Sequence, residues 1–120
     1  MPSTYSPKRG DILRIRFDPS EGSEQAGERP VLVISPDLIN ERAPIILVAP
    51  LTTRKTECVY AFEALIEPPE GGLSQRSKVM LLHIRGVDRA RITGVYGTLS
   101  PETLQSVDVA IRIAVGLTPL

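Results

Sequence analysis

The sequence of 120 residues contains no tryptophan, one cysteine and one histidine, which are Cys58 and His83. A single cysteine cannot form an internal disulfide bond, and this usage is typical of a protein from a reducing compartment. With no acidic cluster at ligand spacing either, the chain lacks the side chains of the usual zinc and calcium sites. We therefore expect no bound metal and no cofactor.

Net charge and long apolar runs are missing as well. The 14 basic side chains balance the 14 acidic ones, so any binding of nucleic acid must come from a local basic patch. No apolar run reaches the roughly 18 residues of a membrane span, and the N-terminus lacks the apolar core of a signal peptide. These absences predict a cytoplasmic protein that makes no membrane contact.

Proline and glycine, by contrast, are frequent. Eleven prolines and nine glycines separate short apolar runs, a pattern that favours many short strands over long helices. The length predicts one domain, residues 1–120, with residues 1–8 as a flexible lead. The expected strands, in chain order, are residues 12–17, 31–34, 45–49, 59–66, 77–85 and 92–98.

Four of these strands carry more specific expectations. Residues 12–17 alternate, with apolar side chains on one face and arginines on the other, whereas residues 31–34 are apolar throughout and predict a strand covered on both faces. Pro50 ends the third strand, so residues 51–56 are expected to form a polar loop. In residues 77–85, Met80, Leu82 and Ile84 share one face, and Lys78 lies at the solvent edge.

One convincing helix follows at the C-terminus. Ser100 is a good N-cap and Pro101 suits the first helical position, while Gly116 provides a stop. Apolar residues recur at helical spacing between them, which predicts a helix packed on a sheet. With short helical turns at residues 36–40 and 88–91, the whole is a mainly β protein: a small, strongly bent antiparallel barrel of five to seven strands with a C-terminal α-helix.

The stretch GSEQAGERPVLVI, residues 22–34, joins a polar loop bounded by glycines to an apolar strand. Arg29 stands at the junction, and Pro30 suits the first residue of the strand. A guanidinium held at a rigid strand start can donate two parallel hydrogen bonds to a phosphate. For an isolated arginine, a surface salt bridge would be the preferred interpretation.

Other polar side chains stand near predicted strand ends, and each has an ordinary structural alternative. Thr52 and Thr53 are typical of loop hydroxyls, and Ser77 of a cap at a strand start. His83 is more often a packed or surface residue than a catalyst. Arg85 is more often paired with a nearby carboxylate, such as Asp88.

The order of several motifs decides between these interpretations. The chain resembles the MazF/PemK/Kid family of toxin endoribonucleases in Arg9-Gly10-Asp11, in GSEQAGERPVLVIS over residues 22–35, in Pro50-Leu51-Thr52, and in IRGVDRARI over residues 84–92. The resemblance implies a small SH3-like barrel, shared with the gyrase poison CcdB, and a homodimer. It also implies a metal-independent mRNA interferase of a type II toxin–antitoxin system. Such an enzyme cleaves single-stranded RNA sequence-specifically by 2′-OH attack, and a cognate antitoxin with an acidic, amphipathic C-terminal segment inhibits it.

Carried over position by position, the resemblance puts the catalytic pair on Arg29 and Thr52. It makes substrate-binding residues of the remaining candidates, which are Ser23, Glu24, Gln25, Thr53, Ser77, His83 and Arg85. Family members usually carry glutamine where this chain has His83, so RNA specificity and pH dependence are expected to differ there. Arginine stays protonated at neutral pH and is a poor base, which leaves water, the phosphate itself or His83 to accept the 2′-OH proton.

Two alternatives belong to other functional classes. A non-catalytic CcdB-like toxin would bind DNA gyrase or another protein, but CcdB-type toxins act through C-terminal residues, whereas this chain keeps the Arg29 and Thr52 pair. A structural SH3-like adaptor would show neither RNA cleavage nor an effect on growth.

Overall fold

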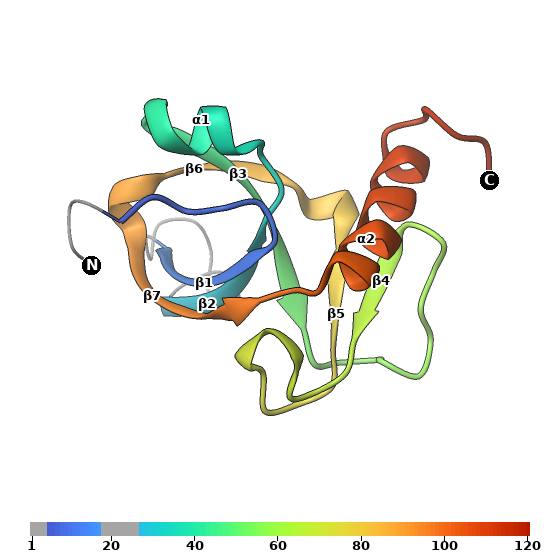
Figure 1. The fold of residues 1–120 in the computed structure, drawn as a ribbon. Helices are drawn as coiled ribbons and strands as arrows, with labels where there is room; N and C mark the ends of the chain where they lie inside the picture. The colour runs from blue at the N-terminus through green and yellow to red at the C-terminus, as the bar shows by residue number, and fades with distance from the viewer. Residues whose placement is uncertain (1–4, 18–26) are drawn as a thin grey trace.

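The computed structural model describes residues 5–17 and 27–120 (Figure 1). Its strands are β1 (Asp11–Phe17), β2 (Gly27–Val33), β3 (Ile45–Thr52), β4 (Glu63–Ile66), β5 (Ser77–Met80), β6 (Arg85–Asp88) and β7 (Ile92–Thr98). Its α-helices are α1 (Asp37–Arg42) and α2 (Pro101–Ala114), and its 3-10 turns are η2 (Glu70–Gly72), η3 (Leu81–His83) and η4 (Arg89–Arg91). Within this described part, no helix has the length and apolar character needed to cross a membrane.

The seven strands form one antiparallel sheet in the order β4-β5-β3-β2-β1-β7, with β6 paired to β3 outside this path. In Figure 1 the chain from β6 to β7 curves around the layer made by β1 and β2, while α2 lies at the other end of the molecule beside β4 and β5. The fold is therefore mainly β, an antiparallel SH3-like sheet with a C-terminal helix, as predicted.

Two apolar cores lie on opposite faces of the central strands. Leu13, Ile15 and Phe17 of β1 pack in one core, and Ile12 packs in the other, under α2. β2 likewise places Val31 in the first core and Leu32 in the second, so both of its faces are covered. The alternation expected for β1 and the fully buried strand expected for β2 are both confirmed.

The C-terminal helix also matches its sequence signals. The Ser100 side chain accepts a hydrogen bond from the Thr103 N–H, Pro101 begins the helix, and Val107 is fully buried. Gly116 has φ of +82°, the left-handed conformation that ends many helices.

The expected end of the third strand at Pro50 is wrong. β3 continues to Thr52, because Pro50 stands where the strand exchanges partners: Val31 of β2 is still opposite Pro50, and Val79 of β5 is opposite Leu51. A strand tolerates proline where no partner needs its missing N–H.

The single strand expected over residues 77–85 is also wrong. β5 pairs with the end of β3 and β6 with its beginning, and three extra residues separate the two registers, since Leu51 is opposite Val79 but Val48 is opposite Arg85. These three residues form η3, so Leu82 is 59% exposed rather than on a buried face.

Two further expectations fail. Lys78 is buried rather than at the solvent edge, and β4 begins at Glu63, not at residue 59. Of the flexible lead expected over residues 1–8, the first four residues lie outside the described residues, and the Tyr5 hydroxyl donates a hydrogen bond of 2.9 Å to Asp11. Burial, followed by this bond and by the charge of the Asp11 carboxylate, raises the pKa of Tyr5.

Candidate RNA-binding groove

Arg29 and Thr52 line the same surface depression, which we call the groove. Arg29 is the third residue of β2 and Thr52 the last residue of β3, and the pairing of these neighbouring strands brings the two side chains together. The groove has a volume of about 480 Å³. Its lining residues are Arg29, Pro30, Pro50, Leu51, Thr52, Thr53, Arg54 and Met80.

Local structure orients both members of this pair. The Thr52 Oγ1 accepts a hydrogen bond of 3.1 Å from the Arg54 N–H. This bond closes a turn at the start of the following loop, whose first residues lie along the groove. Arg29 is exposed, and its Nη1 donates to the carbonyl of Glu28 at 3.4 Å. An exposed guanidinium beside a half-buried hydroxyl presents several donors to an anion.

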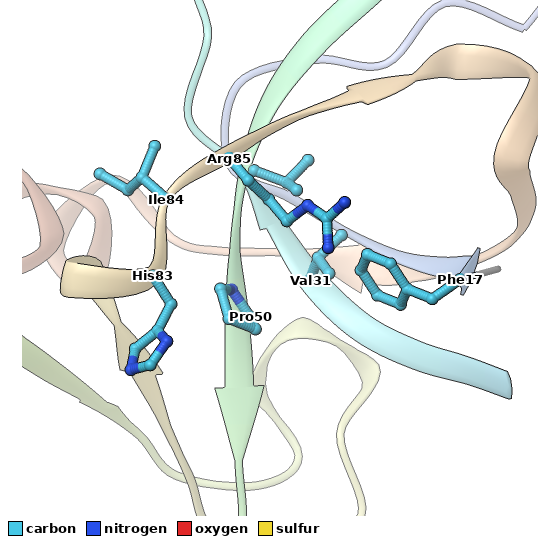
Figure 2. Close-up of a pocket in the computed structure, with 7 residues that line it drawn as sticks. Phe17, Val31, Pro50, His83, Ile84 and Arg85 are labelled. Atoms are coloured by element: carbon cyan, nitrogen blue, oxygen red, sulfur yellow. The ribbon is translucent and has the colours of Figure 1, made fainter. Parts of the chain in front are cut away.

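A smaller pocket of about 170 Å³ adjoins the groove and shares Pro50 with it (Figure 2). The Arg85 guanidinium lies over the ring of Phe17, with its central carbon 4.9 Å from the ring centroid. His83, the last residue of η3, lies at the edge of this pocket near Pro50, as Figure 2 shows. The Phe17 ring is only 2% exposed beneath this guanidinium, so the polar side chains that the pocket offers a ligand are Arg85 and His83.

The predicted site residues therefore divide into four groups, of which Ser77 by itself is the last. Arg29, Thr52 and Thr53 line the groove, and His83 and Arg85 line the adjoining pocket. Ser23, Glu24 and Gln25 lie outside the described residues.

Ser77 is the one described candidate that lines neither the groove nor the adjoining pocket. It is opposite Ile66 in the β4–β5 pairing, on the core face of the sheet, whereas Thr52 is opposite Lys78 on the other face. The Ser77 hydroxyl is buried and donates to the carbonyl of Gln75 at 3.0 Å. The strand-cap interpretation of Ser77 thus fits its position.

Several residues that line these two cavities were not predicted as site residues, among them Phe17, Met80 and Arg54. Phe17 was interpreted only as the last core residue of an alternating strand, Met80 as a member of a buried face, and Arg54 as part of a polar loop. A cation directly after Thr52 and Thr53 was a usable signal for Arg54. Nothing in the sequence marked Phe17 as a residue at the end of the barrel.

In the described part of the chain, no group of three or more histidine, cysteine, aspartate or glutamate side chains could hold a metal ion. The cationic residues of the groove and the pocket, Arg29, Arg54 and Arg85, supply positive charge on a chain whose formal net charge is zero. A local group of arginines attracts a polyanion even when the formal net charge of the whole chain is zero.

Comparison with known proteins agrees with this geometry. The chain is 34% identical to the endoribonuclease toxin MazF of Escherichia coli over 119 residues, covering 97% of this chain and 100% of that one. It is 34% identical to the endoribonuclease EndoA of Bacillus subtilis over 110 residues, covering 92% and 95%. A crystal structure of MazE–MazF from Deinococcus radiodurans superposes with a TM-score of 0.76 at 29% identity, covering 95% of this chain and 99% of that chain.

The family described as PemK-like, MazF-like toxin of type II toxin–antitoxin system matches residues 8–115, which is most of the chain. Together with identity of about a third over nearly the full length of the curated relatives, this match establishes that the chain belongs to the PemK-like, MazF-like toxins of type II toxin–antitoxin systems.

Proposed function

We propose that this chain is a toxin endoribonuclease that cleaves single-stranded RNA at specific sequences without a metal ion. The observation that carries the proposal is the placement of Arg29 and Thr52, from two neighbouring strands, on one groove. Two relatives that are 34% identical to this chain are named endoribonucleases, which supports the same reaction class here.

The chemistry needs few protein groups, because RNA contains its own nucleophile. The 2′-oxygen attacks the adjacent phosphorus, the bond from phosphorus to the 5′-oxygen breaks, and the products are a 2′,3′-cyclic phosphate and a 5′-OH end. Negative charge collects on the non-bridging oxygens during attack, where positioned donors lower the barrier most. Arg29 supplies the guanidinium and Thr52 the hydroxyl.

Two protons must move in this reaction, one from the 2′-OH and one to the departing 5′-oxygen. Arginine does not give up its proton in proteins, so we propose that Arg29 stabilises the negative charge on the departing 5′-oxygen while water supplies the proton. For the proton of the 2′-OH, we propose His83, because it is the one imidazole of the chain and lines the pocket that adjoins the groove. Neutral imidazole is the usual general base near neutral pH.

Single-stranded RNA fits the site better than a duplex. In-line attack requires a nucleotide splayed out of A-form geometry, and sequence readout requires exposed base edges. The pocket lined by Pro50, Ile84, Arg85 and His83 gives one such nucleotide apolar contacts and polar groups at its edge. Thr53 and Arg54 extend the contact along the groove.

The partners follow from the family. We propose that a cognate antitoxin inhibits this toxin, since the family is defined within type II toxin–antitoxin systems and the Deinococcus structure contains MazE with MazF. An acidic, amphipathic segment of the antitoxin would complement the arginines of the groove. We also propose a homodimer acting in the cytoplasm, which exposed Ile45 and Leu47 on β3 support as an apolar face for a second copy. The family match over residues 8–115 supports a single toxin domain over residues 1–120.

The direct test incubates the purified protein in EDTA with a long single-stranded RNA, beside Arg29→Ala and Thr52→Ala, and maps the fragment ends by sequencing. Discrete cuts with 5′-OH ends that both variants lose would support the proposal and reveal the cleavage motif. RNA that stays intact under all conditions would overturn it, and inhibition of DNA gyrase would then be measured as the CcdB-like alternative.

A further inference from the structure

Lys78 is a buried lysine with no role in the proposed chemistry. It is the second residue of β5, is 5% exposed, and stands opposite Thr52 of β3 and Leu65 of β4. Side chains opposite each other in an antiparallel pair project from the same face of the sheet. Lys78 therefore shares its face with Thr52, next to the groove.

The ammonium group of Lys78 is held by three partners. Its Nζ donates to the carbonyl of Cys58 at 2.8 Å and to the Glu63 carboxylate at 2.9 Å. It also lies 5.7 Å from the centroid of the Tyr60 ring, within the range of a cation–π contact. The side chains of Lys78 and Glu63 are only 6% and 10% exposed, so this is a buried ion pair.

Two of these partners belong to the connection between β3 and β4, residues 53–62, which we call the β3–β4 loop. This loop passes over Lys78, and its first residues, Thr53 and Arg54, line the groove. Figure 1 shows it as a long green segment that follows β3 and contains neither helix nor strand. Its shape therefore depends on turn contacts and on the ammonium beneath it.

Several other contacts of the loop join residues that are close in sequence. The Cys58 N–H donates to the carbonyl of Lys55 at 3.1 Å, and the Tyr60 ring stacks on Phe62 with centroids 5.4 Å apart. The Glu63 carboxylate, besides pairing with Lys78, accepts the Tyr60 N–H at 3.0 Å. Lys78 thus connects Cys58, in the middle of the loop, and Glu63, just after its end, to strand β5.

We propose that Lys78 is a positioning residue that holds the β3–β4 loop in the shape that presents Thr53 and Arg54 to RNA. This inference rests on the proposed ribonuclease function and adds to it a residue that determines substrate affinity. Thr52 keeps its place without the Lys78 side chain, because the backbone pairing of β3 with β5 sets its position. Loss of Lys78 therefore acts on RNA binding and leaves the chemical step unchanged.

The experiment uses the one cysteine of the chain as a reporter. Cys58 is exposed and lies in the β3–β4 loop, so a nitroxide label attached to it reports loop mobility by electron paramagnetic resonance without any added mutation. In Lys78→Met we expect a narrower, more mobile spectrum. In RNA cleavage we expect KM to rise about tenfold with kcat within about twofold, the pattern of an interaction made equally in the ground and transition states.

A double variant separates positioning from folding stability. Lys78→Met alone leaves the Glu63 carboxylate buried without its cation, which is strongly destabilising, whereas Lys78→Met with Glu63→Leu removes both charges. We expect the double variant to recover most of the wild-type stability in urea denaturation, yet to keep the mobile label and the raised KM. Lys8→Met, which changes an exposed lysine of the lead before β1, is the matched control and should alter neither reading.

Three results would overturn the inference: an unchanged label spectrum in Lys78→Met, an unchanged KM, or a KM restored to the wild-type value in the double variant. RNA left intact by the wild-type protein would overturn the proposed function instead. The label spectrum would then still decide whether Lys78 holds the loop.

Discussion

Arg29 and Thr52 differ in what the fold does for them. Arg29 stands at the exposed start of β2, and its backbone is held by pairing with Ile15 of β1. Thr52 is the last residue of β3 and has its hydroxyl oriented by the turn at Arg54. Each side chain needs to lie within a fraction of an ångström of its productive place, and strand positions provide that better than loop positions.

Thr52→Val removes the hydroxyl and keeps the shape of the side chain. We expect cleavage to fall about a hundredfold, the usual cost of losing one donor at a developing oxyanion. Thr52→Ser keeps the hydroxyl and should retain most of the rate, as measured in single-turnover assays on a defined RNA. Equal losses in the two variants would argue against a role for the hydroxyl.

His83→Gln tests the proposed base. A base works only in its unprotonated form, so the wild-type rate should rise with pH and then level off. The glutamine variant should lose that rise and fall about a hundredfold at its maximum. A pH–rate profile of both proteins decides the matter, and coinciding profiles would remove His83 from the mechanism.

At the scale of elements, the structure depends on contacts made at the ends of strands and helices. Glu70 of η2 shows this: its carboxylate accepts the Ser100 N–H at 2.9 Å and the Thr103 hydroxyl at 2.9 Å, at the N-terminus of α2. Burial raises the pKa of Glu70, but these hydrogen bonds outweigh it, and the net result is a pKa below the ordinary 4.5. A carboxylate also interacts favourably with the positive end of a helix dipole.

Glu70→Gln should lower the free energy of unfolding at pH 7 by about 1 kcal/mol, the usual value of a helix cap. Because the folded pKa is depressed, the contribution of Glu70 is fully present above the unfolded pKa near 4.5 and disappears as the pH falls through the lower folded value. The stability difference between wild type and variant should therefore shrink in acid. Urea denaturation at pH 7 and at pH 3 measures it, and a difference that stays constant would contradict the assignment.

Gly72, also in η2, lies against β7. It has φ of +75°, and an added Cβ would stand 1.8 Å from the carbonyl oxygen of Tyr96. Gly72→Ala should cost more than about 4 kcal/mol or prevent folding, because a backbone atom cannot move aside as a side chain can. Gly116 also has a positive φ of +82° but open space around it, so Gly116→Ala should cost only about 1 kcal/mol. Free energies of unfolding that are equal in Gly72→Ala and Gly116→Ala, measured by urea denaturation, would contradict the packing of η2 on β7.

The molecule as a whole has two apolar cores that share the central strands. β3 is paired with β2 and β6 in its first part and with β5 in its last part, so one strand passes from one core to the other. The groove and its adjoining pocket meet at Pro50, where this exchange takes place. The candidate site thus lies where β3 changes from pairing with β2 and β6 to pairing with β5.

Charge acts at this scale too. The formal net charge is zero, and the cations that the described residues place in the groove and the pocket are Arg29, Arg54 and Arg85. For single strands this predicts a slope of about −2 in a plot of log affinity against log salt concentration. Arg54→Gln should reduce the slope by about 0.7. Fluorescence anisotropy with a 2′-deoxy RNA that cannot be cleaved measures both.

Arg112→Gln, which removes an exposed cation from α2, is the control for that experiment and should leave the slope unchanged. If both variants changed the slope equally, RNA binding would be spread over the surface rather than confined to the groove.

The sequence by itself determined the parts whose signals are local. Alternation placed Leu13, Ile15 and Phe17 in one core, the apolar run from Val31 was covered on both faces, and Ser100 with Pro101 began the helix. These signals are local because hydrophobic period and capping act within a few residues. The family and the placement of Arg29 and Thr52 on one groove were predicted from sequence motifs in the same way.

Only the tertiary structure decided where strands exchange partners and which polar groups become buried. A proline inside β3 and the break at η3 both follow from the pairing of one strand with three others, which no window of sequence records. Lys78 was expected at a solvent edge because lysine usually is exposed, yet a distant loop covers it and Glu63 neutralises it. Burial of a charge depends on contacts between residues far apart in sequence, and it is therefore a property that the fold alone determines.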